Sequence, residues 1–91
     1  MKQWGVYILL CGDGSLYTGI TDNLMNRLAV HRAGKGAKYT RGRGPLTVKY
    51  WEECSDHSTA LKREWAIKHL SRDEKLKLIQ SQAHMKKLPA K

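Results

Sequence analysis

Acidic residues are scarce in this chain of 91 residues, and a long central stretch has none. The sequence contains 8 Asp and Glu residues against 17 Lys and Arg, which gives a formal net charge of +9. Between Asp22 and Glu52 there is no acid at all. The cations of this stretch are Arg27, Arg32, Lys35, Lys38, Arg41, Arg43 and Lys49. A basic surface can serve solubility alone, but so long an acid-free stretch favours a polyanionic partner such as a nucleic acid.

Cysteine is nearly absent as well. Cys11 and Cys54 are isolated and form no C-x-x-C pair, so we do not expect a structural zinc site. Two lone thiols without a secretory segment are typical of reduced cysteines in a cytoplasmic protein. The apolar run from Val6 to Cys11 is too short for a membrane span or a signal peptide. The sequence therefore predicts one small intracellular domain over residues 1–82, followed by a flexible basic tail over residues 83–91.

Two triplets of tyrosine and glycine lie on a predicted β-hairpin. The first strand, about residues 4–11, ends in a Gly-Asp-Gly-Ser turn, and the return strand covers about residues 16–21. The triplets are Gly5-Val6-Tyr7 and Tyr17-Thr18-Gly19. A two-residue loop would put Tyr7 and Tyr17 on opposite faces of the sheet, whereas three or five residues put them on the same face.

The distribution of apolar residues favours the loop with an odd number of residues. That register gives one nearly all-apolar face, made of Trp4, Val6, Ile8, Leu10, Leu16 and Ile20. The other face consists of Gly5, Tyr7, Leu9, Tyr17, Gly19 and Thr21. We therefore expect the two tyrosines side by side, with glycines that leave room beside them.

The remainder of the chain predicts one further strand and three helices. A helix over residues 24–33, capped from Thr21-Asp22-Asn23, should direct Leu24, Met25 and Leu28 inward. After a glycine-rich loop, a third strand covers residues 46–54. Helices follow at residues 59–70 and 72–82, and the second of these starts with a capping box at Ser71-Arg72-Asp73-Glu74. The element order is β-β-α-β-α-α, which predicts an α+β fold with helices packed on a small sheet.

Glu64 is the sharpest single candidate for chemistry. On a helix, Ala60, Leu61 and Ile67 lie on both sides of it, so its side chain should point toward the sheet. A buried lone carboxylate is costly unless it is paired or bound to a metal. Mg²⁺ often takes only one or two protein carboxylates. The alternatives are an exposed i, i+4 bridge to Lys68 or a structural bridge to a neighbouring arginine.

Arg27 and His31 stand one turn apart on the first helix, on the edge expected to face the tyrosines. The guanidinium of Arg27 fits two phosphate oxygens and can stabilise charge at phosphorus, and His31 could transfer a proton or orient water. The alternative for both is an ordinary surface residue, which is the commoner case for a single arginine or histidine. Tyr7 and Tyr17 could be core residues, because a phenol with a pKa of about 10 needs a neighbouring cation to act as a base.

The loop after the first helix is rich in glycine and cations and reads as a phosphate-contacting segment. Its candidate nucleic-acid-binding residues, with Arg32 at the helix end, are Arg32, Lys35, Lys38, Tyr39, Arg41 and Arg43. Tyr39 could stack on a base or reach the tyrosine site. The alternative without a binding function is a flexible, solvated loop.

Together these residues resemble the GIY-YIG endonuclease superfamily over about residues 3–82. The superfamily is named after two triplets, Gly-Ile-Tyr and Tyr-Ile-Gly, and we call them the name motif. This chain has Val6 and Thr18 at the two Ile positions and keeps every Tyr and Gly of the motif. Arg27 and Glu64 fall where the family keeps its arginine and its metal-binding glutamate. The segment Gly19-Ile20-Thr21, His31 and the loop with Tyr39 are similar to those of the branched-DNA structure-specific nucleases and their small stand-alone bacterial relatives. Excision-repair relatives carry a lysine where this chain has Ile20.

The resemblance implies a three-stranded antiparallel sheet flanked by helices and a metal-dependent DNA endonuclease. It implies that Glu64 holds Mg²⁺ or Mn²⁺, that Tyr7 accepts a proton from the attacking water, and that Arg27 stabilises the transition state. Tyr17 and His31 would orient the water. Relatives usually carry extra domains for target recognition, so low specificity or a partner protein is expected here. The alternatives are a module that binds DNA or RNA without cutting it and a basic ribosomal-type structural protein.

Overall fold

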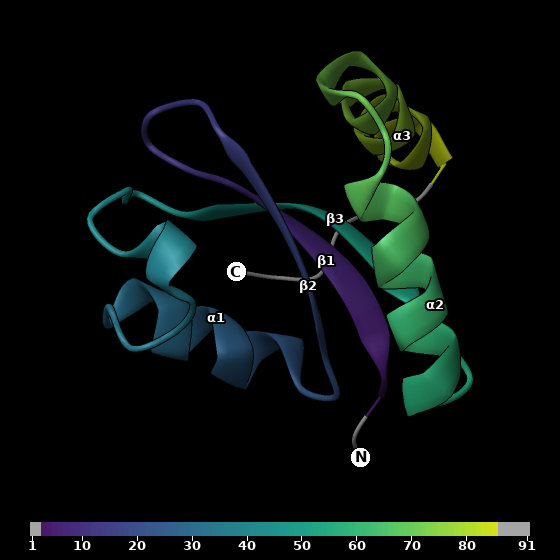
Figure 1. Ribbon diagram of the computed structural model, residues 1–91, viewed down its shortest axis with the longest axis horizontal. Coiled ribbons are helices and arrows are strands. Elements are labelled where there is room, and N and C mark those ends of the chain that lie inside the picture. The colour runs from purple at the N-terminus through teal and green to yellow at the C-terminus, as the bar shows by residue number, and fades with distance from the viewer. Residues whose placement is uncertain (1–2, 86–91) are drawn as a thin grey trace.

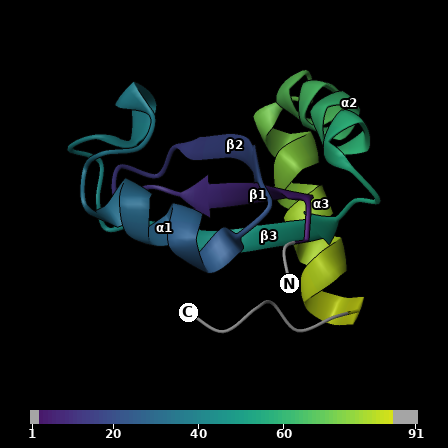
Figure 2. The ribbon, with the colours of Figure 1, turned by 90° about the horizontal axis from the view of Figure 1, so that it is seen from below.

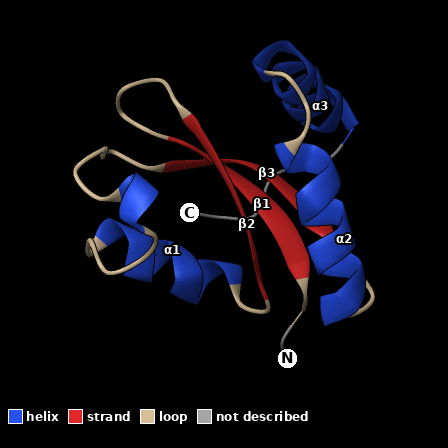
Figure 3. Ribbon diagram, viewed as in Figure 1, coloured by secondary structure: helices blue, strands red, loops and turns tan. Residues whose placement is uncertain are grey.

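The computed structural model describes residues 3–85 and contains the predicted order of strands and helices (Figures 1 and 3). The elements are β1 (Gly5–Leu10), β2 (Leu16–Thr21), α1 (Leu24–Arg32), β3 (Thr47–Glu53), α2 (His57–Lys68) and α3 (Arg72–Met85). One short 3-10 helix, η1 (Lys38–Thr40), interrupts the basic loop. Helix α3 continues three residues beyond its predicted end, and residues 86–91 of the predicted tail lie outside the described residues.

The three strands form one antiparallel sheet in the order β2-β1-β3. In the β1–β2 hairpin, Tyr7 pairs with Gly19 and Leu9 pairs with Tyr17. Five residues separate the two strands, so Tyr7 and Tyr17 share a face, as the apolar pattern predicts. The antiparallel sheet of the family resemblance is confirmed.

Helices cover both faces of the sheet (Figures 1 and 2). Helix α1 lies on the face that carries the tyrosines, whereas α2 and α3 lie on the apolar face. The first core contains Tyr7, Leu9, Cys11, Leu24, Leu28 and Leu46. The second contains Val6, Ile8, Tyr50, Cys54, Ala60 and Ile67. The predicted division of the hairpin into two faces is therefore confirmed, and each face has its own core.

The prediction for Met25 is wrong, because its side chain is 47% exposed. The buried positions of α1 are Leu24, Leu28 and His31, spaced i, i+4 and i+7. This stripe points at the sheet, and Met25 lies about 100° away from it around the helix. An imidazole, rather than the thioether of Met25, takes the third inward position.

Side-chain caps fix where the helices begin. Asn23 Oδ1 accepts the backbone N–H of Asn26 at the start of α1. Asp56 Oδ1 accepts the N–H of Thr59 at 2.8 Å, so α2 begins at His57, two residues before its predicted start. At α3 the predicted capping box is confirmed, since Ser71 N–H donates to Glu74 and Glu74 N–H donates to Ser71 Oγ.

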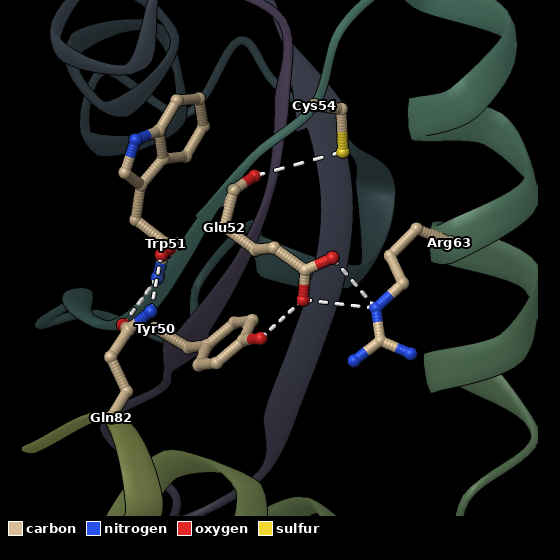
Figure 4. Close-up of polar contacts among 6 residues, drawn as sticks. All are labelled: Tyr50, Trp51, Glu52, Cys54, Arg63 and Gln82. Carbon is tan, nitrogen blue, oxygen red and sulfur yellow. Dashed lines mark hydrogen bonds and ion pairs between the residues drawn. The ribbon is translucent and has the colours of Figure 1, made fainter. Parts of the chain in front are cut away.

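The outer strand β3 is tied to both helices of the apolar face (Figure 4). Arg63 of α2 donates to both carboxylate oxygens of Glu52, at 2.9 and 2.8 Å, and Tyr50 donates to the same carboxylate. From α3, the Gln82 amide accepts the Trp51 N–H at 2.9 Å and donates to the Trp51 carbonyl. Gln82 thus occupies hydrogen-bonding groups that an edge strand would otherwise leave open. Within residues 3–85 no helix has the length and apolarity needed to cross a membrane.

Candidate active site

Tyr7 lies at the centre of the candidate site, on the middle strand and under α1. Its ring is 1% exposed, and its hydroxyl forms a 2.8 Å hydrogen bond with Nε2 of His31. Burial raises the pKa of Tyr7 to about 12, against a lowering by Arg27, while Tyr17 and Glu64 raise it further. The phenol is therefore protonated at neutral pH.

The bonds around His31 determine which of its nitrogens carries the proton. Nδ1 lies 2.9 Å from Oγ1 of Thr40, whose hydroxyl donates to the Ala37 carbonyl at 3.0 Å. A carbonyl can only accept, so the Thr40 hydrogen is committed and Nδ1–H of His31 must donate to Thr40. Burial, and next the charge of Arg27, lowers the pKa of His31, so the ring is neutral near pH 7 and Nε2 accepts the proton of Tyr7. The chain of donors runs from Tyr7 through His31 and Thr40 to Ala37.

Two glycines make these close contacts possible. A Cβ on Gly19 would lie 2.5 Å from the Tyr7 hydroxyl oxygen and 2.7 Å from Cζ. A Cβ on Gly36 would lie 2.4 Å from Nδ1 of His31. Gly19 lets the phenol lie across β2, and Gly36 lets the basic loop close over the imidazole. The first of these was expected from the sequence.

Aromatic rings extend the site from His31 toward the basic loop. The ring centroids of Tyr17 and His31 are 5.4 Å apart, and Tyr39 stacks on Tyr17 at 5.8 Å with planes 28° apart. The guanidinium carbon of Arg43 lies 4.5 Å from the centroid of Tyr39. Both tyrosines of the name motif, His31 and Tyr39 therefore form one contiguous aromatic group.

Glu64 lies on α2 between the fully buried Ala60 and Ile67, and its side chain is 19% exposed. One carboxylate oxygen stands 3.3 Å from Nζ of Lys68, which is the i, i+4 bridge considered from the sequence. The other alternative, a bridge from Glu64 to an arginine, is not formed among residues 3–85, and the adjacent Arg63 pairs with Glu52. The negative charge of Glu64 also raises the pKa of Tyr7, as the smallest of the causes of that shift.

The donor set of Glu64 suits a hard cation that brings most of its own ligands. Among residues 3–85, no three His, Cys, Asp or Glu side chains come together as a metal-binding group. A single carboxylate is nevertheless compatible with Mg²⁺, which keeps several waters and takes further oxygens from a phosphate. The exposed side of Glu64 and its exchangeable pairing with Lys68 fit that mode of binding.

The predicted nucleic-acid-binding residues fall into two groups. Lys35, Lys38 and Arg41 are exposed on the basic loop. Arg32 donates to the Leu46 carbonyl, at 3.3 and 3.0 Å, and Arg43 pairs with Asp13 across to the β1–β2 turn. The Asp13 carboxylate is ionised at neutral pH, because hydrogen bonds from Ser15, and to a smaller extent Arg43, lower its pKa to about 2. Arg32 and Arg43 therefore anchor the loop as well as adding charge.

Sequence reasoning missed Thr40 and Ala37. Thr40 is nine residues from His31, in a loop without periodicity, and only the turn of η1 brings its hydroxyl to Nδ1. No motif signals such a contact. The sequence itself offers only weak hints, the glycines on either side of Lys35 and the threonine that follows Tyr39.

Comparison with known proteins identifies the same fold and motif. Residues 3–77 match the family model of the GIY-YIG catalytic domain. The UPF0213 protein OB0043 of Oceanobacillus iheyensis is 57% identical over 81 residues, covering 89% of this chain and 94% of that protein. The UPF0213 protein SH2523 of Staphylococcus haemolyticus is 52% identical over 80 residues, covering 88% and 98%.

Two solution structures are similar in fold. The protein EF2693 from E. faecalis superimposes with a TM-score of 0.64 at 35% identity, covering all of this chain and 96% of that one. The UPF0213 protein BH0048 from Bacillus halodurans gives a TM-score of 0.55 at 45% identity, covering 88% and 84%. The matched catalytic domain spans both tyrosine triplets, Arg27, His31 and Glu64. The chain belongs to the GIY-YIG nuclease superfamily, among its small UPF0213 proteins.

Proposed function

We propose that this protein is a divalent-metal-dependent endonuclease that hydrolyses phosphodiester bonds in DNA, acting in repair or on branched or single-stranded DNA. The observation that carries the proposal is the bond from the Tyr7 phenol to an unprotonated Nε2 of His31. A buried phenol that donates to a neutral imidazole can pass its proton on while it takes one from water.

The proton path begins at the attacking water. Tyr7 cannot accept a proton while it keeps its own, because its pKa of about 12 leaves it protonated at neutral pH. As its oxygen takes the water proton, its own proton moves to Nε2 of His31, and His31 becomes an imidazolium. Thr40 holds the ring in the tautomer that accepts. Excision-repair relatives have a lysine at the position of Ile20, and in this chain His31 would take over its role in activating the base.

Arg27 is the proposed phosphate-binding residue. Its guanidinium lowers the pKa of both Tyr7 and His31, which supports a position beside the proton path. A planar cation there can bind two phosphate oxygens and stabilise the charge that grows on them during in-line attack. Tyr17, whose ring lies beside those of Tyr7 and His31, would orient the water.

Glu64 would hold Mg²⁺ or Mn²⁺, and Lys68 would leave the carboxylate when the cation arrives. A bound divalent cation supplies charge neutralisation at the scissile phosphate and the leaving oxygen. The exposed cations Lys35, Lys38 and Arg41 would contact the backbone of the substrate. The free thiols of Cys11 and Cys54 agree with a cytoplasmic location, and a partner protein would supply target recognition.

The test is cleavage of single-stranded, duplex and branched DNA by purified protein in Mg²⁺ or Mn²⁺, beside Glu64→Ala. We expect nicking by the wild type and loss of most of it in Glu64→Ala, with DNA affinity in a chelator nearly unchanged. Lys68→Ala is the matched control: it removes the partner of Glu64 and should keep cleavage. Equal residual nicking in wild type and Glu64→Ala would contradict the enzyme proposal.

One observation favours the second candidate, a module that binds nucleic acid without cutting it. The ion pair with Lys68 gives Glu64 a partner that requires no metal. If the wild type binds DNA and never cuts it, this candidate stands.

A further inference from the structure

A groove outside the motif residues opens at the start of β2. It is lined by Ser15 and Leu16 of the hairpin, Tyr39 of the basic loop, and Arg72 and Lys75 of α3. The groove thus joins three parts of the chain that are far apart in sequence. We call this set of five residues the α3 groove.

The α3 groove combines positive charge with an aromatic ring. Arg72 and Lys75 are three residues apart, so both face the same side of α3. Neither forms an ion pair among the residues that the structure describes. Tyr39 contributes a ring that is 42% exposed. Two available cations beside an aromatic surface are the groups that bind the backbone and bases of a single nucleic-acid strand.

Aromatic contacts connect the α3 groove to the candidate active site. Tyr39 stacks on Tyr17, and Tyr17 contacts His31, so two ring-to-ring steps of 5.8 and 5.4 Å separate the groove from the proton path. Leu16, in the groove, directly precedes Tyr17 on β2. A strand bound at the site could therefore continue along β2 into the groove.

The size of the groove argues for part of a polymer rather than for a separate ligand. Its volume is about 200 Å³, which is below the roughly 300–1,000 Å³ of typical small-molecule sites. It is also open to solvent, so it can receive a strand that enters and leaves.

We propose that the α3 groove binds the nucleic-acid strand next to the bond that is cut, with Arg72 and Lys75 on phosphates and Tyr39 against a base. The proposal rests on the proposed function for the position of the cut. It extends the binding surface from the basic loop to α3, and it favours single-stranded or unpaired DNA, whose bases are free to reach Tyr39.

The test measures affinity for a fluorescein-labelled single-stranded DNA by anisotropy at several salt concentrations, in a chelator that prevents cleavage. The variant Arg72→Gln/Lys75→Gln removes the groove cations. The matched control, Lys62→Gln/Lys77→Gln, removes the same charge from exposed positions of α2 and α3 outside the groove. Each lost contact to a single strand lowers the slope of log affinity against log salt by about 0.7. We expect a decrease of about 1.4 for the groove variant and almost none for the control.

Tyr39 provides a second measurement. Tyr39→Ala should weaken binding roughly tenfold at every salt concentration, whereas Tyr39→Phe should bind as the wild type does. Equal slopes in the groove and control variants, or no binding of this DNA by the wild type, would overturn the proposal. Cleavage by the wild type is measured separately. If the protein binds this DNA with the expected difference in slope but does not cut it, the nuclease proposal fails and the α3 groove remains a binding site for the strand.

Discussion

The Tyr7 phenol lies directly against the backbone of Gly19, so that a Cβ at position 19 would stand 2.5 Å from the hydroxyl oxygen. The two residues are a cross-strand pair of the hairpin. Only a residue without a side chain allows the ring to lie flat across β2 and still reach His31. The second glycine of the name motif is therefore a steric requirement of the first tyrosine.

Gly19→Ala should displace Tyr7 from His31. The ring is buried and cannot move outward, so the new methyl group breaks the 2.8 Å bond or strains the sheet. We expect a stability loss of about 1–3 kcal/mol from overpacking, and a loss of cleavage of at least about 100-fold because the proton path is interrupted. Thermal unfolding and single-turnover cleavage measure the two effects.

Gly5→Ala separates crowding from chemistry. A Cβ there would meet the Trp51 ring at 2.4 Å, so this variant is also overpacked, but against strand β3 and not against the phenol of Tyr7. Its cleavage rate per folded molecule should stay near that of the wild type. A similar loss of cleavage in both alanine variants would mean that Gly19 acts through general stability alone.

The sequence predicts the arrangement of Tyr7 and Tyr17 well because strand periodicity leaves little freedom. Side chains alternate, so a single choice of loop length determines which residues of the hairpin share a face. The failure at Met25 has a different origin. A hydrophobic pattern cannot rank an imidazole against a thioether when the imidazole finds two hydrogen-bond partners inside, as His31 does with Tyr7 and Thr40.

The partner of Glu64 could not be chosen from the sequence. Lys68 and a neighbouring arginine were both possible, and in the structure Glu64 pairs with Lys68. Arg63 lies about 100° from Glu64 around α2 and pairs with Glu52 of β3. Contacts made by the rotation of a helix on a sheet, like the loop contact of Thr40, depend on tertiary packing that local patterns do not contain.

Thr40→Val should impair cleavage without touching Tyr7 or His31. Valine has nearly the shape of threonine but cannot accept from Nδ1–H, so the tautomer with the proton on Nε2 becomes favourable. In that tautomer His31 donates to Tyr7 and cannot take its proton. We expect a loss of roughly tenfold or more in kcat, and rescue by Thr40→Ser, which keeps the hydroxyl.

The imidazole nitrogens give a readout that is independent of activity. Nitrogen NMR of the wild type and of Thr40→Ser should show a protonated Nδ1 and an unprotonated Nε2 on His31, and Thr40→Val should change this pattern. Unchanged nitrogen shifts in Thr40→Val together with reduced cleavage would refute the tautomer explanation.

Stability should fall on acidification because of His31. Burial lowers its pKa in the folded protein below the ordinary value of about 6.5. Below pH 6.5 the unfolded chain therefore binds a proton that the folded protein does not, and stability increases with pH through this range. The contribution is complete above about pH 6.5 and is lost as the pH falls toward the folded pKa.

The measurement is the free energy of unfolding between about pH 5 and 7.5 for the wild type and His31→Gln. Glutamine does not titrate, and the other histidines are common to both proteins. The difference in stability between the two should shrink as the pH falls. Parallel curves would show that His31 has the same pKa in the folded and unfolded states.

Gln82 should stabilise the sheet by closing the edge of β3. Its amide bonds both the N–H and the carbonyl of Trp51, the contact that an additional strand would make (Figure 4). Gln82→Ala removes two hydrogen bonds, worth about 1–2 kcal/mol together, which corresponds to a decrease in Tm of roughly 4–16 °C in a domain of this size.

Gln80→Ala, on an exposed position of the same helix, makes the same substitution without that contact and should change Tm little. Cleavage should be unaffected below the transition, because α3 packs on the apolar face of the sheet, opposite the Tyr7 phenol. Exposure of the edge also predicts concentration-dependent association of Gln82→Ala, measured by light scattering. Equal Tm values for the two alanine variants would show that the bond from α3 to β3 contributes nothing to the fold.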